Sequence, residues 1–392
     1  VSRYLDSLEQ QINRYRRPLF VMQSNGGVVP AAHVRKFSAG LVESGPAAGV
    51  LGASLLSRQL GLEHAVAFDM GGTTAKACLI DRGKAGETRE MEVGGEGLLK
   101  GAGYALRCPG FDLEEIGAGG GSIAWVDGGG ALRIGPASAG AVPGPVCYGR
   151  GGQSPTITDA NVLLGYMSPV ALAGGTVPID KAAALRAFER DLCPKLNLSA
   201  LDAAHGVHQV ANSTMMRALR AVTTERGQNP RECTLIAFGG AGPIHAANLA
   251  ADLEISRVVV PLYPGLFSAL GLLVADLRFE FLRSMSGRLD QIAGEQLAEG
   301  YAKLVVRARS ELMQAGLDPG AARYQRLMDV HYEKQTTELT LGLPDDRGEP
   351  ADLVPAVVAH FHEEHQRIYG YQRSSEPIGL LNLRIRASAP GC

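Results

Sequence analysis

The sequence predicts an α/β fold for most of the chain and a separate α+β domain at its C-terminal end. Apolar runs typical of buried strands lead three times into a Gly-Gly turn, within residues 18–27, 64–81 and 233–250. Stretches with helical spacing separate these runs. After about residue 283 glycine becomes scarce, and a helix, a strand pair, a second helix and a final strand are expected.

Composition and charge narrow the class of protein. The chain has 392 residues, enough for two or three domains, and 45% of them are hydrophobic, which excludes intrinsic disorder. Lysine and arginine number 38 against 40 aspartate and glutamate residues, so the basic excess typical of nucleic-acid binding is absent. The 50 glycines indicate many tight turns or close approaches to a ligand. Six widely spaced cysteines indicate neither a zinc module nor a disulfide scaffold, and they predict a cytoplasmic location.

The beginning of the chain predicts a helix. Residues 1–17 have helical spacing without the apolar centre of a signal peptide or an initiator methionine, so the chain is expected to begin inside a longer protein. We assign residues 1–43 to the end of a preceding lobe or to a connecting segment. A lobe is predicted over residues 44–283, and the α+β domain over residues 284–392.

Within the lobe, local signals place the first elements. A helix is expected from Ser44 to Gly61, entered through a small-residue turn and closed by glycine. A strand, a Gly-Gly turn and a second strand follow over residues 64–81, which is a hairpin pattern. Two further helices are expected around residues 180–191 and 199–226, the latter with a serine N-cap.

Two stretches allow more than one interpretation. Residues 94–152 are dense in glycine, proline and serine, but interleaved apolar residues such as Trp125 favour short inserted strands over a flexible linker. Residues 258–275 carry no charge and approach the length of a membrane span. Because Pro261 and Pro264 interrupt this stretch, we expect a buried strand, a loop and a packed helix, and no membrane span.

The strongest chemical signal is the segment from Asp69 to Thr74. Asp69 stands near the end of a buried strand, Gly71 and Gly72 form the turn, and Thr73 and Thr74 leave it. Backbone N–H and hydroxyl donors gathered in this way suit a phosphate group, and the carboxylate could hold a water of a bound Mg²⁺. The P-loop pattern of other phosphate-binding loops is absent. A plain hairpin with a glycine turn is the alternative.

A second signal lies in residues 237–246, where a buried strand opens onto a glycine-rich loop before a helix. Gly239, Gly240 and Gly242 would let the backbone approach a flat ligand such as a nucleotide, with helix N-terminal donors nearby. Loops of this kind are common, so this one gains specificity only from following the Asp69 segment in the same chain.

Several single residues are weaker candidates. Four acidic residues flank a glycine run and could orient water or a metal ion, although solvated loop acids are an equal alternative: Asp112, Glu114, Glu115 and Asp127. Asp159 is expected to cap a helix. Cys147 has no evident base and is expected to be a buried thiol. The remaining candidates are expected on solvated helix faces: His205, His208, His360, His362 and His365.

Together these motifs resemble a known family. DMGGTT and FGGAGPIHA are similar to the second phosphate motif and the adenosine motif of the actin, sugar kinase and heat-shock ATPase superfamily. Further stretches are similar to the hydantoinase A and 5-oxoprolinase family, which includes acetone and acetophenone carboxylase subunits: MQSNGG, SGPAAG, IGAGGGSIA, GPVCYGRGG, TDAN, PGLFSALGLL and YGY. The resemblance implies an actin-like, ribonuclease H-like ATPase lobe that carries glycine-rich inserted strands.

The resemblance also implies an activity. ATP and Mg²⁺ would be the cofactors, and ATP would phosphorylate the amide oxygen of a cyclic amide such as 5-oxoproline or a hydantoin before water attacks. Asp69, as the metal-binding residue, and residues 71–74 would hold phosphate and Mg²⁺, while Gly239, Gly240 and Gly242 would pass along the adenosine. The catalytic candidates are then Asp69, Asp112 and Asp127. A hydantoinase B-type subunit or domain and a homo-oligomer are the expected partners, without nucleic acid or membrane.

Departures from the family pattern leave two other functions open. Family members usually begin with another Asp-x-Gly-Gly-Thr loop, which this chain lacks, so a non-catalytic nucleotide-binding or assembly module is one alternative. Asp112-Leu113-Glu114 stands where many members have Asp-x-His, and Lys76 stands where many have aspartate. The first difference removes the histidine that would bind a metal ion there. Lys76 points to the carboxylase-like or uncharacterised branch, which makes a carboxylase subunit the other alternative. We also expect Gly120→Ala to impair turnover while costing only about 0.4–1 kcal/mol of stability.

Overall fold

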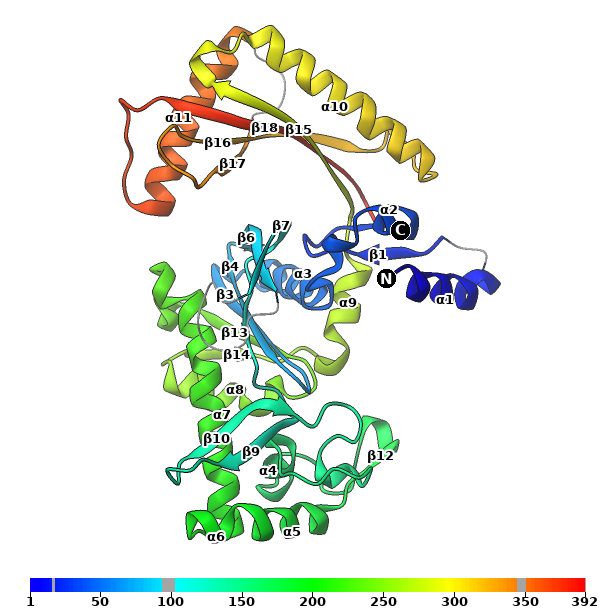
Figure 1. The fold of residues 1–392 in the computed structure, drawn as a ribbon, viewed down its shortest axis with the longest axis vertical. Helices are drawn as coiled ribbons and strands as arrows, with labels where there is room; N and C mark the ends of the chain where they lie inside the picture. The colour runs from blue at the N-terminus through cyan, green and yellow to red at the C-terminus, as the bar shows by residue number, and fades with distance from the viewer. Residues whose placement is uncertain (16–17, 94–102, 344–349, 392) are drawn as a thin grey trace. The chain divides into compact units, whose positions relative to one another are not determined.

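A computed structural model describes residues 1–15, 18–93, 103–343 and 350–391. Contacts within the chain divide it into two compact units (Figure 1). Unit 1 consists of Val1–Val21, Gly27–Lys36 and Asp276–Cys392, and unit 2 of Met22–Gly26 and Phe37–Ala275. These contacts group residues 276–283 with the C-terminal part, because a long strand runs through them. The domain boundaries expected at residues 43 and 283 stay a prediction.

Unit 1 is built on a six-stranded sheet with the strand order β1-β2-β15-β18-β16-β17. Its long central strands pair antiparallel, and α10 and α11 pack against the sheet and each other. Phe279 and Phe281 of β15 are buried, because alternate residues of a strand face the same side. The elements are β1 (Phe20–Met22), β2 (Val28–Pro30), β15 (Leu277–Arg288), α10 (Gly294–Gln314), β16 (Arg323–Tyr332), β17 (Leu339–Gly342), α11 (Pro350–Tyr369) and β18 (Ile378–Ala389).

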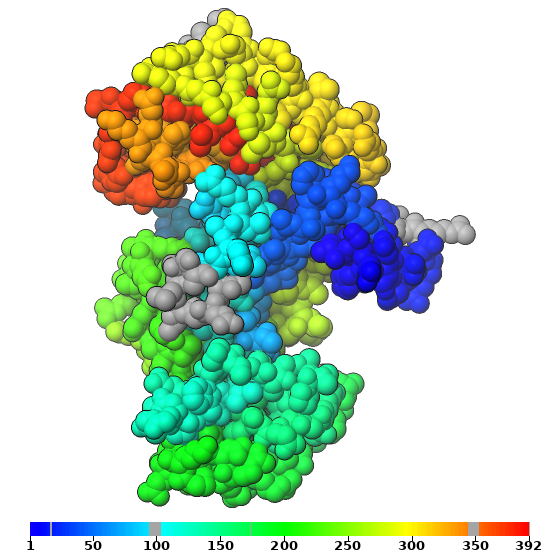
Figure 2. Space-filling view, viewed as in Figure 1, coloured from blue at the N-terminus to red at the C-terminus, as the bar shows by residue number. Residues whose placement is uncertain are grey.

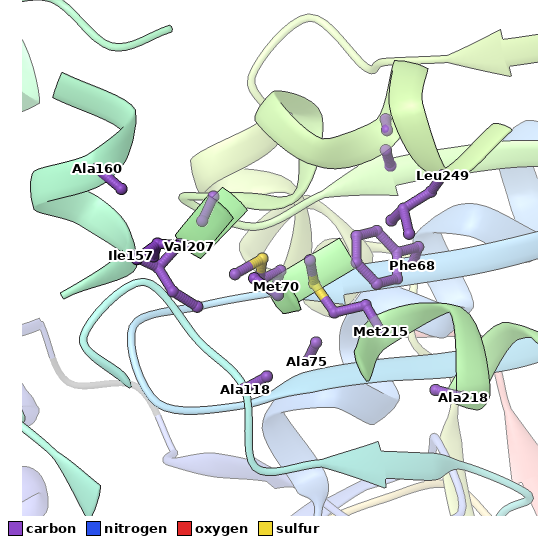
Figure 3. Close-up of a cluster of buried hydrophobic side chains, with 14 of the residues drawn as sticks. Phe68, Met70, Ala75, Ala118, Ile157, Ala160, Val207, Met215, Ala218 and Leu249 are labelled. Carbon is purple, nitrogen blue, oxygen red and sulfur yellow. The ribbon is translucent and has the colours of Figure 1, made fainter. Parts of the chain in front are cut away.

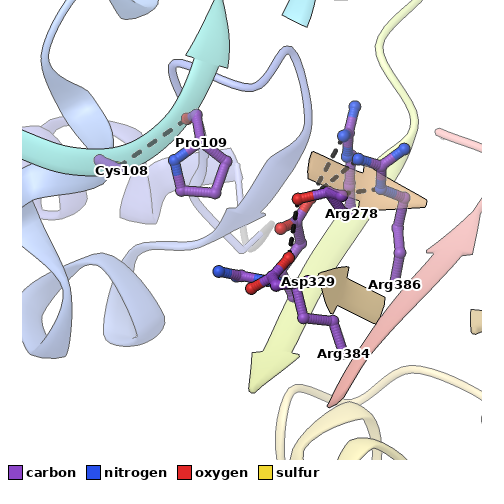
Figure 4. Close-up of polar contacts among 8 residues, drawn as sticks. Cys108, Pro109, Arg278, Asp329, Arg384 and Arg386 are labelled. Carbon is purple, nitrogen blue, oxygen red and sulfur yellow. Dashed lines mark hydrogen bonds and ion pairs between the residues drawn. The ribbon is translucent and has the colours of Figure 1, made fainter. Parts of the chain in front are cut away.

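The other strand positions of this sheet carry paired charges (Figure 4). Asp329 is fully buried, and its carboxylate accepts hydrogen bonds from Arg384 Nε (2.6 Å), Asn382 Nδ2 (2.9 Å) and Thr340 Oγ1 (2.7 Å). Glu280 of β15 forms an ion pair with Arg386 of β18, with 3.1 Å between Glu280 Oε1 and Arg386 Nη2. A buried carboxylate is tolerated when its acceptor positions are filled like this.

Unit 2 contains a mixed sheet with the order β14-β13-β3-β4-β5, and β8 pairs with β4. β13 runs parallel to β3 and β14, whereas β3 and β4 form the antiparallel hairpin expected from the sequence. The strands are β3 (His64–Met70), β4 (Ala75–Asp81), β5 (Lys84–Ala85), β8 (Glu114–Ile116), β13 (Thr234–Phe238) and β14 (Arg257–Val259).

Helices cover both faces of this sheet. On one face Phe68 and Met70 pack with Met215 of α7 and Leu249 of α8 (Figure 3). On the other face, alternate residues such as Ala67 pack against two further helices, α3 and α9. The four helices are α3 (Ser44–Gln59), α7 (Ala200–Val222), α8 (Gly242–Asp252) and α9 (Phe267–Leu273). The carboxyl ends of β3 and β13 therefore lie between two helical layers.

The glycine-rich stretch forms short strands, as predicted, apart from residues 94–102, which lie outside the described residues. Figures 1 and 2 show residues 122–196, which form β9, β10, α4, α5 and α6, together at one end of unit 2. The elements are β6 (Glu87–Val93), β7 (Tyr104–Phe111), β9 (Ser122–Val126), β10 (Leu132–Ser138), α4 (Ile157–Leu163), α5 (Lys181–Asp191) and α6 (Cys193–Leu196).

Other sequence predictions can be checked element by element. Ser199 caps α7 by accepting a hydrogen bond from the backbone of Asp202, as predicted. The uncharged stretch from residue 258 forms the end of β14, a short 3₁₀ turn and α9. Contrary to the expectation, the strand is not buried, because β14 lies at the edge of the sheet and Val258 is 37% exposed. None of the helices in the described part of the chain is both long and apolar enough to cross a membrane.

Candidate functional site

The turn after Asp69 presents open backbone. β3 ends at Met70 and β4 begins at Ala75, and the Gly71 N–H donates to the Thr74 carbonyl at 3.1 Å. A Cβ atom added at Gly71 or Gly72 would meet nothing within 4 Å. The segment is a hairpin, and its turn also leaves space for a ligand beside the backbone.

Asp69 is partly buried, and its carboxylate accepts no hydrogen bond from any described residue. Burial raises the pKa of this carboxyl group, and the positive charge of Lys76 opposes that shift. Lys76 stands directly opposite on β4, and its ammonium group contacts the carboxylates of Glu43 and, at 3.4 Å, Glu115. One cation thus lies among three carboxylates, which leaves an excess of negative charge of the kind that suits a divalent cation.

A second glycine loop packs directly on this turn. The Gly120 N–H donates to the Gly71 carbonyl at 3.0 Å, and the Gly121 N–H donates to the Gly72 carbonyl at 2.6 Å. A Cβ atom at Gly119 would lie 2.4 Å from the carbonyl carbon of Thr73, so only glycine allows this approach. The loop at residues 119–122 therefore packs on the Asp69 turn through backbone contacts.

The third loop follows β13 and meets the same turn. Phe238 pairs with Asp69 across the parallel strands, and the Ala241 N–H donates to the Met70 carbonyl at 2.9 Å. Gly239 has a φ of +84°, and a Cβ atom there would lie 2.4 Å from Asp69 Oδ1. Gly240 borders open space, and α8 begins at Gly242. Three glycine loops from distant parts of the sequence therefore converge at the carboxyl end of β3.

The other two acidic candidates have their contacts elsewhere. Asp112 forms a two-pronged ion pair with the guanidinium of Arg226, one contact of which is 2.9 Å. Asp127 accepts hydrogen bonds within the β9–β10 hairpin, from the backbone of Gly129 (3.0 Å) and Ala131 (2.9 Å) and from Arg133 Nε (2.8 Å). The described contacts bring neither residue to Asp69. Glu115 is the flanking carboxylate that reaches the site, because β8 pairs with β4.

Two sequence predictions are confirmed next to these loops. Asp159 forms a capping box with Thr156 at the start of α4, and its carboxylate also accepts from the Val146 and Cys147 backbone at 3.2 and 2.7 Å. Cys147 is fully buried, and burial raises the pKa of its thiol, as expected for an unreactive cysteine.

The solvated-face prediction is wrong for two histidines. His365 is 1% exposed because it lies one turn after Phe361 on the buried side of α11, and its Nδ1 is 2.8 Å from the carbonyl oxygen of Tyr371. His208 is fully buried on the side of α7 that faces α8. Its ring stacks on that of His245, in α8, at a centroid distance of 4.5 Å. Sequence reasoning gave no role to His245, although it lies inside the FGGAGPIHA motif.

The structure indicates a larger stability loss for Gly120→Ala than the loss of about 0.4–1 kcal/mol expected from the sequence. A Cβ atom there would lie 2.7 Å from Thr158 Oγ1, a buried hydroxyl that donates to the Gly120 carbonyl at 2.8 Å. The neighbouring chain must shift to make room, so the cost exceeds that of a compatible Gly→Ala change.

Comparison with known proteins places the chain in a family. A model of the hydantoinase/oxoprolinase family matches residues 1–281. The chain belongs to the hydantoinase/oxoprolinase family. An uncharacterized protein of Methanocaldococcus jannaschii is 41% identical over 97% of this chain and 55% of its own length. The caprolactamase subunit alpha of Pseudomonas jessenii is 32% identical over 98% of this chain and 54% of its own length.

Solved structures agree with this assignment. The ATP-dependent caprolactamase of Pseudomonas jessenii matches 99% of this chain and 56% of its own chain, with a TM-score of 0.77 and 30% identity. An ATP-dependent acetone carboxylase matches 95% of this chain and 53% of its own, with a TM-score of 0.77 and 25% identity. Other relatives in the family are named 5-oxoprolinase or acetone and acetophenone carboxylase subunits. The chain spans about half the length of the curated relatives it matches.

Proposed function

We propose that this chain is the part of an ATP-dependent amidohydrolase that holds the phosphates of the nucleotide. The convergence of the three glycine loops beside Asp69 carries this proposal, because backbone approaches of this kind suit phosphate and adenosine. Membership of a family that includes ATP-dependent relatives supports it.

The residues at the turn fit a bound Mg²⁺ and nucleotide. No group of three His, Cys, Asp or Glu side chains that could hold a metal directly occurs in the described residues, but a Mg²⁺ held through its own waters needs only one or two carboxylates. Asp69 would be that carboxylate, residues 71–74 would hold the phosphates, and Gly239, Gly240 and Gly242 would lie along the adenosine. When bound, ATP would supply the phosphoryl group that activates the amide oxygen.

The finer parts of this proposal rest on the family resemblance. We infer an actin-like, ribonuclease H-like lobe, a cytoplasmic location and a cyclic amide substrate such as 5-oxoproline, a hydantoin or caprolactam. Catalytic roles for Asp112 and Asp127 stay predictions, and their ion pair and turn contacts favour structural roles first.

A carboxylase subunit is the second candidate, because the acetone carboxylase structure matches with the same TM-score as the caprolactamase. Phosphate release by the full-length protein separates the two. A cyclic amide should stimulate release if the proposal holds, whereas stimulation only by a ketone together with bicarbonate would identify the carboxylase.

We also infer that the protein works in a larger assembly, with a hydantoinase B-type polypeptide and as a homo-oligomer. Three relatives are named as subunits. Exposed apolar side chains follow β14, a surface of the kind that subunit contacts cover: Val260, Leu262, Tyr263, Leu266 and Leu273. Light scattering of the isolated chain should show association, and a stable monomer would contradict the inference.

Calorimetric titration with Mg-ATP tests the site itself. Asp69→Ala should remove most of the binding, at least a tenfold loss, because the other two carboxylates near the turn, those of Glu43 and Glu115, already pair with the ammonium group of Lys76. Asp127→Ala is the matched control and should bind as tightly as the wild type. Equal affinities of the wild type and Asp69→Ala would reject the assignment of this turn.

A further inference from the structure

A chain of buried hydrogen bonds joins helices α4, α7 and α8 beside the glycine loops. We propose that His245, at the centre of this chain, is a positioning residue that holds the loop at residues 239–242 in place against the turn at residues 69–74. The inference rests on the proposed function for its effect on nucleotide binding, but the loop arrangement itself can be measured without nucleotide.

Both ring nitrogens of His245 have side-chain partners. Nδ1 lies 2.6 Å from Asn212 Oδ1 of α7, and Nε2 lies 3.2 Å from Asn161 Nδ2 of α4. Asn161 Oδ1 in turn lies 2.9 Å from Nδ1 of His208, whose ring stacks on His245 with an interplanar angle of 11°. None of these four side chains is more than 3% exposed. Three helices are therefore tied together by directional bonds in an otherwise apolar core.

The protonation states follow from the partners. An amide oxygen only accepts, so each imidazole donates from Nδ1, and His245 accepts from Asn161 at Nε2. The His245 ring is then neutral, because its Nε2 carries no hydrogen. Burial lowers the pKa of His208 and lowers that of His245 to about 3, as expected for stacked imidazoles away from water. The chain of bonds keeps a single direction across the pH range in which enzymes work.

These bonds reach the glycine loops at both ends. His245 lies in the first turn of α8, three residues after Gly242, and Asn161 lies in α4. At the start of α4 the Thr158 N–H and hydroxyl both donate to the Gly120 carbonyl at 2.8 Å. Gly120 bonds Gly71, and Ala241 bonds Met70, so the contacts close a ring that contains all three loops.

The ring has a consequence for binding. Glycine loops have high conformational freedom, and ordering them when a ligand binds costs affinity. The hydrogen bond between Asn161 and His245 helps to fix the distance between the turn at residues 69–74 and the loop at residues 239–242 before any ligand binds. An apolar side chain at position 245 would fill the space but leave the buried amides of Asn161 and Asn212 without this partner.

Three variants of the chain separate positioning from stability. His245→Leu removes both bonds, His245→Gln keeps a polar group at the centre, and Leu249→Ala opens a cavity one turn later in α8, where Leu249 is fully buried. His245→Leu should bind Mg-ATP about tenfold more weakly, and its amides at residues 119–121 and 239–242 should exchange hydrogen faster without nucleotide. His245→Gln should recover most of the affinity. Leu249→Ala should melt earlier but keep the wild-type affinity within twofold and the wild-type exchange at both loops.

The outcomes separate this inference from the proposed function. If the wild type does not bind Mg-ATP, the nucleotide proposal fails, while hydrogen exchange still decides the role of His245. The inference is overturned if His245→Leu retains the wild-type rate of hydrogen exchange at residues 239–242. It is also overturned if Leu249→Ala weakens Mg-ATP binding as much as His245→Leu does. In either case His245 is only a packing residue. Asn212→Ala removes one hydrogen bond of His245 and keeps its imidazole. This variant provides the same comparison if His245→Leu does not fold.

Discussion

Two hairpins of this protein carry an acidic residue beside a glycine turn. They differ in which residues form hydrogen bonds with the backbone of the turn. In the β9–β10 hairpin, Asp127 itself accepts two backbone N–H groups of its own turn. In the β3–β4 hairpin, the carbonyls of Gly71 and Gly72 are bonded by Gly120 and Gly121, nearly fifty residues away in the sequence. In the first turn the carboxylate is hydrogen-bonded within its own hairpin. In the second turn the carboxylate of Asp69 accepts no hydrogen bond from the described residues and can bind another partner.

The pKa shifts of the two carboxyl groups have opposite directions for the same reason. Hydrogen bonds from Arg133 and from the backbone hold the pKa of Asp127 below its usual range. Burial without hydrogen bonds from the described residues raises the pKa of Asp69. A partly buried carboxylate of the second kind is a candidate for binding a cation or ligand, because functional groups often have shifted pKa values.

The largest expected difference between the two turns is steric. Gly119→Ala would place a Cβ atom 2.4 Å from the backbone of Thr73, so one loop must move, and we expect unfolding to become easier by about 3 kcal/mol. Gly128→Ala, in the Asp127 turn, meets nothing within 4 Å and should change stability by less than about 0.5 kcal/mol. Urea unfolding of both variants measures this, and equal losses would contradict the close approach of the two loops.

A smaller effect is expected at Gly120, where the obstacle is a side chain. Because the added Cβ atom would lie 2.7 Å from Thr158 Oγ1, we expect Gly120→Ala to cost about 1–2 kcal/mol. Thr158→Ala removes that hydroxyl, so the double variant should lose less than the sum of the two single losses. Additive losses in urea unfolding would place the strain of Gly120→Ala elsewhere.

The local parts of this site could be predicted from the sequence. The hairpin at residues 64–81, the capping roles of Ser199 and Asp159 and the buried thiol of Cys147 all depend on neighbours within a few residues or on side-chain chemistry alone. The Asp69 turn is predictable for the same reason, because strand, glycines and hydroxyl residues follow one another directly in the chain.

The remaining parts depend on contacts between distant segments. No local pattern states that β8 pairs with β4 and brings Glu115 to Lys76, or that Asp112 turns to Arg226. His208 lies on the buried stripe of α7 between Ala204 and Ala211, a spacing that fits its burial, but its hydrogen-bond and stacking partners come from α4 and α8, which no local pattern names. The side of a helix that is buried is decided by the elements that pack on it.

A moderate effect is expected when the charge opposite Asp69 is removed. Lys76 lowers the pKa of Asp69 against the effect of burial, so Lys76→Met should raise that pKa further. If the ionised carboxylate holds Mg²⁺, Mg-ATP binding weakens as the pH falls through this pKa. The variant should therefore lose affinity at a higher pH than the wild type, while the two differ little at pH 8. Titrations between about pH 5 and pH 8 check this, and superimposable pH profiles would remove Lys76 from the site.

The smallest effect on stability is expected at Asp127, in the turn of the β9–β10 hairpin. The pKa of Asp127 is lowered in the folded protein, so its ionised form stabilises the fold above the usual carboxyl pKa of about 3.9, and that stabilisation is lost as the pH falls through the lowered value. Asp127→Asn should therefore melt slightly earlier than the wild type at pH 7 and together with it at strongly acidic pH. Because its contacts stay within the hairpin, Mg-ATP affinity should be unchanged at every pH. A loss of affinity without a loss of stability at pH 7 would show that Asp127 acts in the site after all, and that the two turns share a function.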